Sequence, residues 1–305
     1  MSRICVVGAA NMDLISYVKR LPKMGETLHG SRFHMGFGGK GANQAVMAAK
    51  LGAQVSVVTK LGRDVFGENT LENFRSFGID CTHVLFTEEA FSGVAPIAVD
   101  EKGNNSIVIV TGANDLLSEE DIEAARPAIA AAQILVCQLE TPLDTTLAAL
   151  RIAREEKVKT IFNPAPGAAG LPEELFPLSD IFCPNESETE LITGLPVGSI
   201  EEATTAAREL LARGAGVIIL TLGERGSLLV SEGYAEHIPA RKVKTLDSTG
   251  AGDAFIGSLA CFVAGGKALP EAVRRANEIA ALSVQASGTQ SSFPSAADLP
   301  AELLD

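Results

Sequence analysis

Short apolar runs alternate with longer amphipathic segments along most of the 305-residue chain. The apolar runs are rich in Val and Ile and predict strands at Ile4–Gly8, Val55–Leu61, Ile134–Leu139, Thr160–Phe162, Ile181–Cys183 and Val217–Leu222. The amphipathic segments predict helices at Gly41–Leu51, Asn69–Phe77, Glu119–Ala132, Leu143–Glu156 and Glu201–Arg213. Strands that are apolar throughout and separated by helices are typical of a parallel sheet with both faces covered. We therefore predict an α/β fold with three layers, α/β/α, around a mostly parallel central sheet.

Two stretches break this alternation, at roughly residues 14–35 and 83–110. Short alternating runs without helical spacing predict strands there, at Leu14–Val18, Val84–Thr87, Gly93–Val99 and Ser106–Val110. The pattern favours antiparallel strands inserted into the α/β body, where they form a small second sheet. The alternative is that they extend the edge of the main sheet.

The charge balance excludes one class of partner. The chain has 25 Lys and Arg against 38 Asp and Glu, a net charge of −13, so it lacks the basic surface that nucleic acid binding requires. If the protein binds an anion, the positive field must come from something other than net charge. The five Cys residues are scattered and form no C-x-x-C pair, which favours reduced thiols in a cytoplasmic protein. No stretch approaches the roughly 20 apolar residues of a membrane span.

A segment near the C-terminus combines an acid, small residues and a helix start. Asp247–Asp253 (Asp-Ser-Thr-Gly-Ala-Gly-Asp) runs into the apolar helix predicted at Ala254–Ala264. Gly250, Ala251 and Gly252 leave backbone N–H groups open at the helix N-terminus, which predicts an anion site. Asp253 could be an ordinary residue of the first helical turn. It could instead take a proton from an attacking hydroxyl beside a bound phosphate.

A second glycine-rich segment lies near the N-terminus. Gly36–Asn43 (Gly-Phe-Gly-Gly-Lys-Gly-Ala-Asn) contains the spacing G-x-G-x-x-G but follows no buried parallel strand. The next strand also ends at Lys60 rather than at an acid, which argues against a dinucleotide site. Small residues before a helix instead let the backbone approach a polyol closely, and Lys40 and Asn43 could bind its hydroxyls.

Polar side chains follow several of the predicted strands. Asn11 and Asp13 come after the first strand, Glu140 after the third, and Asn185 and Glu188 after the fifth. Ligands of open parallel sheets bind at the carboxyl ends of the strands, so these residues are candidates for one site. The alternative is that they are polar loop residues and helix caps.

Together, Gly36–Ala45 and Asp247–Gly257 resemble the two signatures of the ribokinase family of sugar kinases, also called the phosphofructokinase-B-like family. The resemblance covers essentially the whole chain. It implies a large α/β domain spanning 1–305 with a small β-sheet lid inserted in two pieces, at about 13–36 and 90–110. It implies phosphorylation of a sugar by ATP, with Asp253 as the general base and the backbone of Gly250, Ala251 and Gly252 as the anion hole. The implied sugar-binding residues are Asn11, Met12, Asp13, Gly39, Lys40, Gly41, Ala42, Asn43, Glu140 and Asp253.

The resemblance also implies cofactors and an assembly. Asn185 and Glu188 match the N-x-x-E motif that positions magnesium (Mg2+), largely through water. The implied nucleotide contacts are Asn185, Thr221, Leu222, Gly223, Glu224, Arg225, Gly226, Gly252 and Asn277. The implied potassium (K+) site comprises Asp247, Thr249, Ser283, Ala286, Gly288 and Ser292, several of them through backbone carbonyls. The lid of this family often pairs two subunits, which implies a homodimer.

Within the family, the segments Asn11–Asp13, Gln138–Glu140 and Asn163–Pro166 resemble kinases of the 5-hydroxyl of D-ribose. Ser92–Ile97 and Asn104–Ile107 also resemble deoxyribokinases, which act on a sugar without the 2-hydroxyl. Another sugar or nucleoside kinase of the same fold, a catalytically silent sugar-binding protein and a dehydrogenase are the remaining alternatives.

Overall fold

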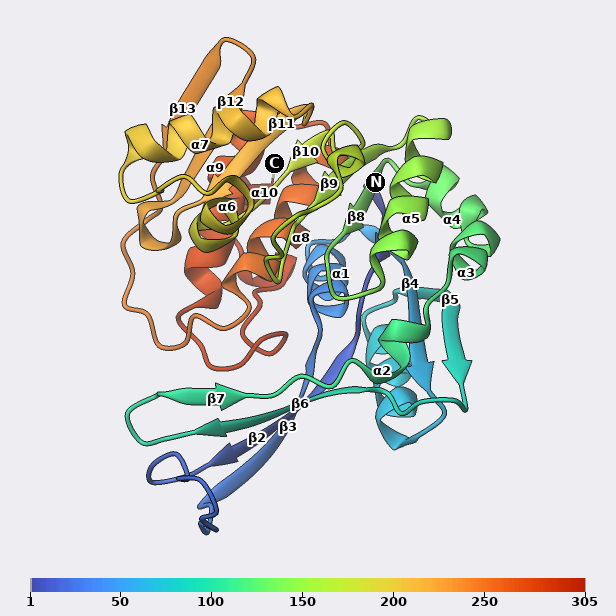
Figure 1. Ribbon diagram of the computed structural model, residues 1–305, viewed down its shortest axis with the longest axis vertical. Coiled ribbons are helices and arrows are strands. Elements are labelled where there is room, and N and C mark those ends of the chain that lie inside the picture. The colour runs from blue at the N-terminus through green and yellow to red at the C-terminus, as the bar shows by residue number, and fades with distance from the viewer. Residues whose placement is uncertain (1, 305) are drawn as a thin grey trace.

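The computed structural model describes residues 2–304, which form two sheets (Figure 1). The large sheet has nine strands in the order β13-β12-β11-β10-β9-β8-β1-β4-β5. Its pairs from β11 to β5 are parallel, whereas β12 and β13 pair antiparallel at one edge. The strands are β1 (Arg3–Val7), β4 (Gln54–Gly62), β5 (Asp80–Thr87), β8 (Ile134–Cys137), β9 (Lys159–Phe162), β10 (Ile181–Phe182), β11 (Val217–Thr221), β12 (Ser227–Ser231) and β13 (Tyr234–Ile238).

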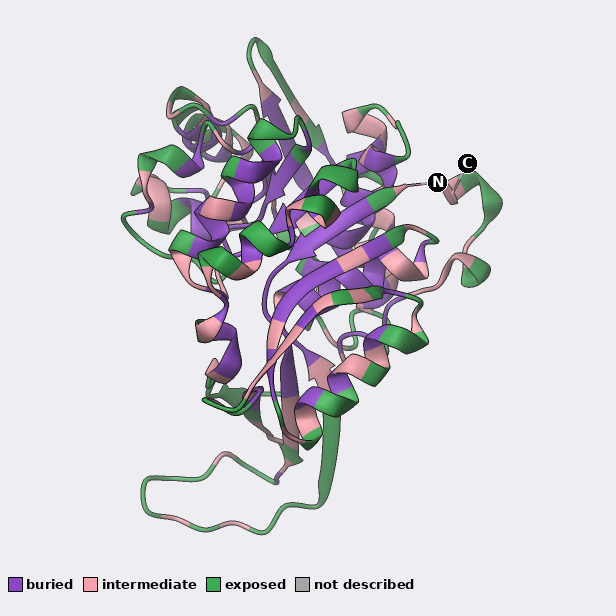
Figure 2. Cartoon of the chain, turned by 90° about the vertical axis from the view of Figure 1, so that its right-hand side faces the viewer, coloured by how far each residue is buried: buried purple, intermediate pink, exposed green. Residues whose placement is uncertain are grey.

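Helices cover both faces of the large sheet, because successive side chains of its strands point to opposite sides. Ile4 and Val6 of β1 pack into one core, and Cys5 and Val7 into the other. The first core is covered by α1 (Lys40–Lys50), α2 (Val65–Ser76), α8 (Ala251–Ala264), α9 (Leu269–Ser283) and α10 (Ala301–Leu304). The second is covered by α3 (Glu119–Ala124), α4 (Arg126–Ala131), α5 (Leu143–Glu155), α6 (Glu186–Thr193) and α7 (Ile200–Ala212). The predicted α/β fold is confirmed, with the sheet strands buried between the helices (Figure 2).

The small sheet extends away from this body (Figure 1). It has the order β3-β2-β6-β7 and comprises β2 (Asn11–Tyr17), β3 (Arg32–Gly38), β6 (Gly93–Val99) and β7 (Asn105–Ile107). The predicted second sheet is therefore confirmed. The division into a kinase domain with a lid in two pieces stays a prediction.

Two predictions within the second segment were wrong. Val84–Thr87 belongs to β5, which pairs parallel to β4 at the edge of the large sheet, because helix α2 connects these strands as a crossover. The central pair of the small sheet, β2 and β6, is also parallel, since a long stretch of chain separates them. Antiparallel pairing holds only for β2 with β3 and for β6 with β7.

The helix predicted at Glu119–Ala132 is two helices, α3 and α4, which meet at Ala125. Pro127 lies in the first turn of α4, where a residue without an N–H group is tolerated but cannot continue the preceding helix. All five cysteines are free thiols. Among residues 2–304, no helix is long and apolar enough to cross a bilayer.

Candidate active site

Helices α1 and α8 bring the two glycine-rich segments together. They pack closely, since a Cβ atom at Gly257 of α8 would lie only 2.6 Å from the carbonyl oxygen of Gln44 in α1. Asn43 and Gln44 in the first turns of α1 reach Asp253 in the first turn of α8. The two signatures, some 200 residues apart in the sequence, therefore form one polar site.

Asp253 is 7% exposed and bound by two side-chain amides. Its Oδ2 accepts from Asn43 Nδ2 at 2.9 Å, and its Oδ1 accepts from Gln44 Nε2 at 3.0 Å. The N-cap of α8 is Gly250, and no side chain caps this helix. Asp253 is thus not a helix cap, and its carboxylate, which offers about four lone-pair sites, retains free acceptor capacity.

The N-terminus of α8 has the features of an anion site. Gly250 has φ 78°, and a Cβ atom there would lie 2.5 Å from Thr289 Cγ2, so a side chain is excluded both by conformation and by space. Of the three residues predicted to form the anion hole, Ala251 does not offer a free N–H group, because its N–H donates to the carbonyl oxygen of Ser248 at 3.2 Å. Within residues 2–304, the N–H groups of Gly252 and Asp253 donate to no other protein group. Open N–H groups at the positive end of a helix attract phosphate oxygens.

Four charged side chains surround the carboxylate of Asp253: Asp13, Lys40, Glu140 and Glu188. Burial, Glu140 and Asp253 together raise the pKa of Asp13 to about 6. Burial alone would lower the pKa of Lys40, but the negative charges of Asp253, Glu140 and Glu188 outweigh it and raise that pKa. Glu140 Oε2 accepts from the backbone N–H of Lys40 at 2.7 Å, and burial raises the pKa of Glu140. The site thus contains several carboxyl groups and one ammonium group, that of Lys40.

The remaining predicted sugar-binding residues line the same region. Asn11 is 5% exposed, and its Oδ1 accepts from Asn114 Nδ2 at 2.9 Å. Met12 is buried on β2. Gly39 is the N-cap of α1, and Gly41 and Ala42 are buried in its first turn. Of the predicted residues, Lys40, Asn43 and Glu140 therefore present polar side chains near Asp253, and Gln44 of α1 adds a further one.

Asn185 and Glu188 form a reciprocal cap at the start of α6. Glu188 Oε2 accepts from the backbone N–H of Asn185, and Oε1 from its Nδ2, both at 2.9 Å. Burial raises the pKa of Glu188. No group of three or more His, Cys, Asp or Glu in the described chain could hold a metal directly. Both carboxylate oxygens of Glu188 already accept from Asn185, so contact with a magnesium ion through water is compatible with this arrangement.

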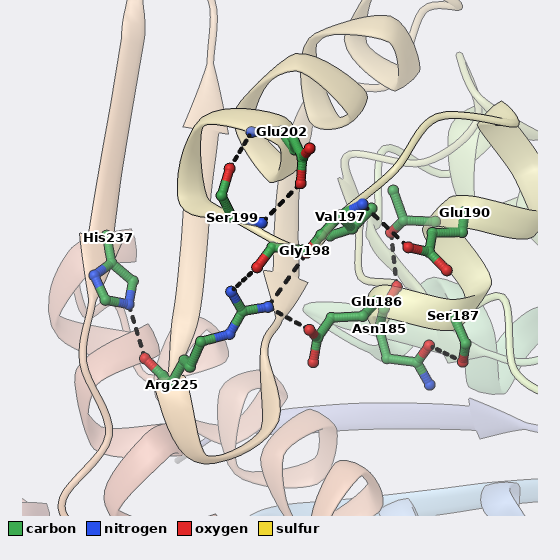
Figure 3. Close-up of polar contacts among 11 residues, drawn as sticks. Asn185, Glu186, Ser187, Glu190, Val197, Gly198, Ser199, Glu202, Arg225 and His237 are labelled. Carbon is green, nitrogen blue, oxygen red and sulfur yellow. Dashed lines mark hydrogen bonds and ion pairs between the residues drawn. The ribbon is translucent and has the colours of Figure 1, made fainter.

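The turn predicted to line the nucleotide, Thr221–Gly226, follows β11 beside the start of α6, where Thr221 forms a bridge with Asn185. Arg225 forms an ion pair with Glu186 and donates to the carbonyl oxygen of Gly198 at 2.8 Å (Figure 3). Its own carbonyl oxygen lies 2.7 Å from His237 Nε2. The side chain of Arg225 thus holds the turn against the neighbouring loop.

Asn277 ties α9 to the β12–β13 hairpin. Its Oδ1 accepts from Ser227 Oγ at 2.7 Å, and its Nδ2 donates to the carbonyl oxygen of Ile238 at 3.0 Å. Because both ends of the amide are bound within the protein and the residue is 5% exposed, its polar atoms have a structural task.

The loop after α9 contains unpaired carbonyl groups. Asp247 accepts from the N–H groups of Gly288 and Thr249, at 2.9 and 3.0 Å. Burial would raise the pKa of Asp247, but these hydrogen bonds lower it. A dehydrated cation needs carbonyl oxygens that accept no hydrogen bond within the protein. In the part of the chain that the structure describes, this holds for the carbonyl oxygens of Thr249, Ala286, Gly288 and Ser292. The carbonyl oxygen of Ser283, in contrast, accepts from the N–H of Ala286. The predicted potassium residues therefore fit such an ion, with Ser283 the exception.

Sequence reasoning placed Asn163 at the end of a strand near the other candidates, but it predicted no site role for Gln44, Gln138 or Gln290. Gln44, Gln138, Asn163 and Gln290 are all buried and hydrogen-bonded to one another or to Asn43 and Asp253. Gln44 directly follows Asn43 in the glycine-rich segment, and Gln138 and Asn163 lie at the ends of predicted strands, so their positions carried a usable signal.

Comparison with known proteins agrees with this geometry. The model of the pfkB family of carbohydrate kinases matches residues 1–296. A ribokinase of Mus musculus is 47% identical over 304 residues, covering 98% of this chain and 94% of the relative. A deoxyribokinase of Salmonella typhi is 43% identical, covering 96% and 95%. The structure of Arabidopsis thaliana ribokinase complexed with ribose and ATP aligns with a TM-score of 0.91 at 31% identity, covering 100% of this chain and 99% of the other.

Proposed function

Because this chain belongs to the pfkB family of carbohydrate kinases, we propose that it transfers the γ-phosphoryl group of ATP to the 5-hydroxyl of D-ribose. The observation that carries the proposal is that Asp253, at the open N-terminus of α8, is hydrogen-bonded to Asn43 and interacts electrostatically with Lys40 and Glu140. A sugar held by the acceptors and donors of α1 and Glu140 would lie beside both a base and an anion site. The similarity to ribokinases over nearly the whole chain supports D-ribose as the sugar.

The proposed reaction needs one proton acceptor and one set of anion-binding groups. The 5-hydroxyl oxygen attacks the γ-phosphorus while its proton passes to the carboxylate of Asp253. The bond from the γ-phosphorus to the bridging oxygen breaks, and ADP leaves with the electron pair. The N–H groups of Gly252 and Asp253 would stabilise the charge on the transferred group, since phosphoryl transfer depends mainly on positioning and electrostatics.

Two metal ions complete the proposal. Magnesium would neutralise phosphate charge, with Glu188 holding it through water, and potassium would bind the carbonyl groups beside Asp247. These cations and the helix N-terminus would supply the positive field that a net charge of −13 does not. We further propose a cytoplasmic location, in keeping with the free thiols.

Deoxyribokinase activity is the second candidate, favoured by the 43% identity to a deoxyribokinase. Of the two segments that resemble such enzymes, Ser92–Ile97 lies beside predicted sugar-binding residues, because Gly93 pairs with Asn11 and Ala95 with Asp13. The hydroxyl of Ser92 is bound to Asp64, the N-cap of α2. Asn104 binds Asp100 in an exposed turn. Neither contact distinguishes a 2-hydroxyl, and the higher identity to a ribokinase, 47% against 43%, supports D-ribose as the first candidate.

A sugar panel with ATP and magnesium tests the proposed function. We expect sugar-dependent ADP release, with kcat/KM highest for D-ribose, lower for 2-deoxyribose, and lower still for fructose and a nucleoside. A missing hydroxyl that leaves a buried polar group unpaired costs about 1–3 kcal/mol, or roughly tenfold or more in kcat/KM. A higher value for 2-deoxyribose would make the chain a deoxyribokinase. No ADP release with any sugar would support a silent binding protein.

Potassium is expected to raise the rate over sodium at equal ionic strength. The larger ion suits a cage of several carbonyl groups, and filling it beside Asp247 would stabilise the loop that precedes α8. Initial rates in matched chloride salts measure the effect. Equal rates in the two salts would remove potassium from the proposal, while leaving the sugar kinase reaction intact.

We also propose that the small sheet pairs two copies of the chain. Phe33 and Met35 on β3 and Val108 after β7 are 59%, 50% and 60% exposed, which is unusual for large apolar side chains gathered on one small sheet. Sedimentation velocity at micromolar concentration is expected to give the mass of a dimer, and Phe33→Glu with Met35→Glu to give the 31.8 kDa monomer. A monomer in the unmodified protein would reject this assembly.

A further inference from the structure

We propose that Gln44 is a positioning residue for Asp253, held in one orientation by a directed chain of side-chain amides. The proposal rests on the role of Asp253 in the proposed function. Gln44 and Asn43 each donate to a different oxygen of the carboxylate, at 3.0 and 2.9 Å. Two donors on two oxygens fix the plane of the carboxylate and leave its other lone pairs for a hydroxyl proton.

The direction of the chain follows from a backbone group that can only accept. The carbonyl oxygen of Cys183 lies 2.9 Å from Asn163 Nδ2, so the oxygen of that amide must face the other way. There it lies 3.2 Å from Gln44 Nε2, which also donates to Asp253. With both acceptors on its NH2 group, Gln44 must turn its own oxygen toward Gln138.

Gln138 shows that this orientation has a cost. Its Nε2 donates to Gln44 Oε1 at 2.7 Å, which leaves its Oε1 without a partner although the residue is 0% exposed. An unpaired buried acceptor costs about 1–3 kcal/mol. Turning the amide round would bring its oxygen against that of Gln44 instead. The unpaired oxygen is therefore the consequence of holding Gln44 with its NH2 group on Asp253.

The hydrogen bonds that lead to the second oxygen of Asp253, Oδ2, have the same donor-to-acceptor direction. Asn43 Oδ1 accepts from Gln290 Nε2 at 3.0 Å, and Gln290 Oε1 accepts from Asn73 Nδ2 at 2.8 Å. On this side too, each amide presents its NH2 group toward the carboxylate. The amide series that ends at Gln44 and the one that ends at Asn43 therefore both present N–H donors to Asp253, which favours its ionised carboxylate, the form that can accept a proton.

Gln44→Glu is the sharpest test, because it keeps the shape and replaces the donor by a negative charge about 3 Å from Asp253 Oδ1. The other charged groups around Asp253, namely Asp13, Glu140, Glu188 and Lys40, stay unchanged. We expect kcat at pH 7 to fall about tenfold or more, and the acid limb of the kcat profile to move up by about one pH unit. KM for the sugar should change little.

Gln138→Leu tests the amide that orients Gln44 but does not itself contact Asp253. It removes the unpaired oxygen of Gln138 but leaves Gln44 Oε1 without its donor, so the number of unpaired buried acceptors stays the same. We therefore expect Tm to change little while kcat falls several-fold. Thr59→Val is the matched control. The Thr59 hydroxyl is also buried without a hydrogen-bond partner, but it is not part of the series of amides that leads to Asp253. This variant should therefore keep both Tm and kcat.

Carbon-13 NMR of the Asp253 carboxyl group separates this proposal from the proposed function. In Gln44→Glu the carbon-13 chemical shift of that carboxyl group at a fixed pH should change, because its amide donor is replaced by a carboxylate, whether or not the protein phosphorylates D-ribose. An unchanged chemical shift, or an unchanged pH profile of kcat, would overturn the positioning role. An unmodified protein without sugar-dependent ADP release would overturn the proposed function alone.

Discussion

Asp253→Asn is expected to lower kcat about a hundredfold to ten-thousandfold while D-ribose still binds with similar affinity. An amide keeps the size of the side chain but cannot take a proton from the attacking hydroxyl. Its NH2 group would also face the donors of Asn43 or Gln44, which now bind the two carboxylate oxygens. Steady-state kinetics and calorimetric titration with D-ribose measure the two effects separately.

Asp180→Asn is the matched control, since Asp180 precedes β10, at the amino end of the strands, and accepts from the Thr160 N–H at 2.8 Å. This variant should keep kcat, even if Tm falls. A second variant, Asp253→Ala, also lacks the base but introduces no NH2 group. Comparing the two variants separates the effect of losing the base from the effect of the NH2 group that Asp253→Asn places against Asn43 and Gln44. If both Asp253 variants kept near-normal turnover, another group would have to accept the proton.

The sequence was sufficient to predict the local geometry around Asp253 because the residues concerned are contiguous. Gly250, Gly252 and Asp253 lie within four residues, and the open helix N-terminus follows from local backbone geometry alone. The same holds for Lys40 and Asn43, which share the first turn of α1. Where the polar groups of a site lie within one helical turn, the order of residues in the sequence is enough to predict how they are arranged.

Contacts between distant segments could not be predicted in this way. Gln138 meets Gln44 across 94 residues, and Gln290 meets Asn43 across 247. Periodicity reports which face of an element is buried, but not which buried amides face each other. The parallel pairing of β2 with β6 was missed for a related reason, because strand direction depends on the path of the intervening chain.

Two residues predicted from family resemblance show the opposite difficulty. Arg225 and Asn277 occur where nucleotide contacts are expected, yet the Arg225 guanidinium binds Glu186 and Gly198 (Figure 3). The Asn277 amide likewise binds Ser227 and Ile238 within the protein. A matching position predicts the location of a residue more reliably than the partner of its side chain. Their contribution to the proposed nucleotide site is to hold its turn and its helix in place.

Gly41→Ala is expected to lower kcat/KM about tenfold to a hundredfold and to reduce the free energy of unfolding by about 1–3 kcal/mol. A Cβ atom at Gly41 would lie 2.7 Å from the backbone carbon of Gly8 and 2.9 Å from the backbone nitrogen of Ala9. Backbone cannot rotate away as a flexible side chain can, so the first turn of α1 must move. Lys40, Asn43 and Gln44 would move with it.

Gly36→Ala distinguishes this displacement from the general cost of replacing a glycine in the segment. Gly36 lies on β3, and the nearest atom to an added Cβ there, Asp13 Cβ, is 3.9 Å away, at ordinary contact distance. Kinetics and thermal unfolding of both variants should show a large loss for Gly41→Ala and almost none for Gly36→Ala. Because Gly41 offers no side chain to a sugar, a loss there would come from moving the residues beside it or from blocking the approach of its backbone to the sugar. Equal kinetics in the two variants would mean that the site tolerates such a shift, and the close approach of α1 to β1 would then serve packing alone.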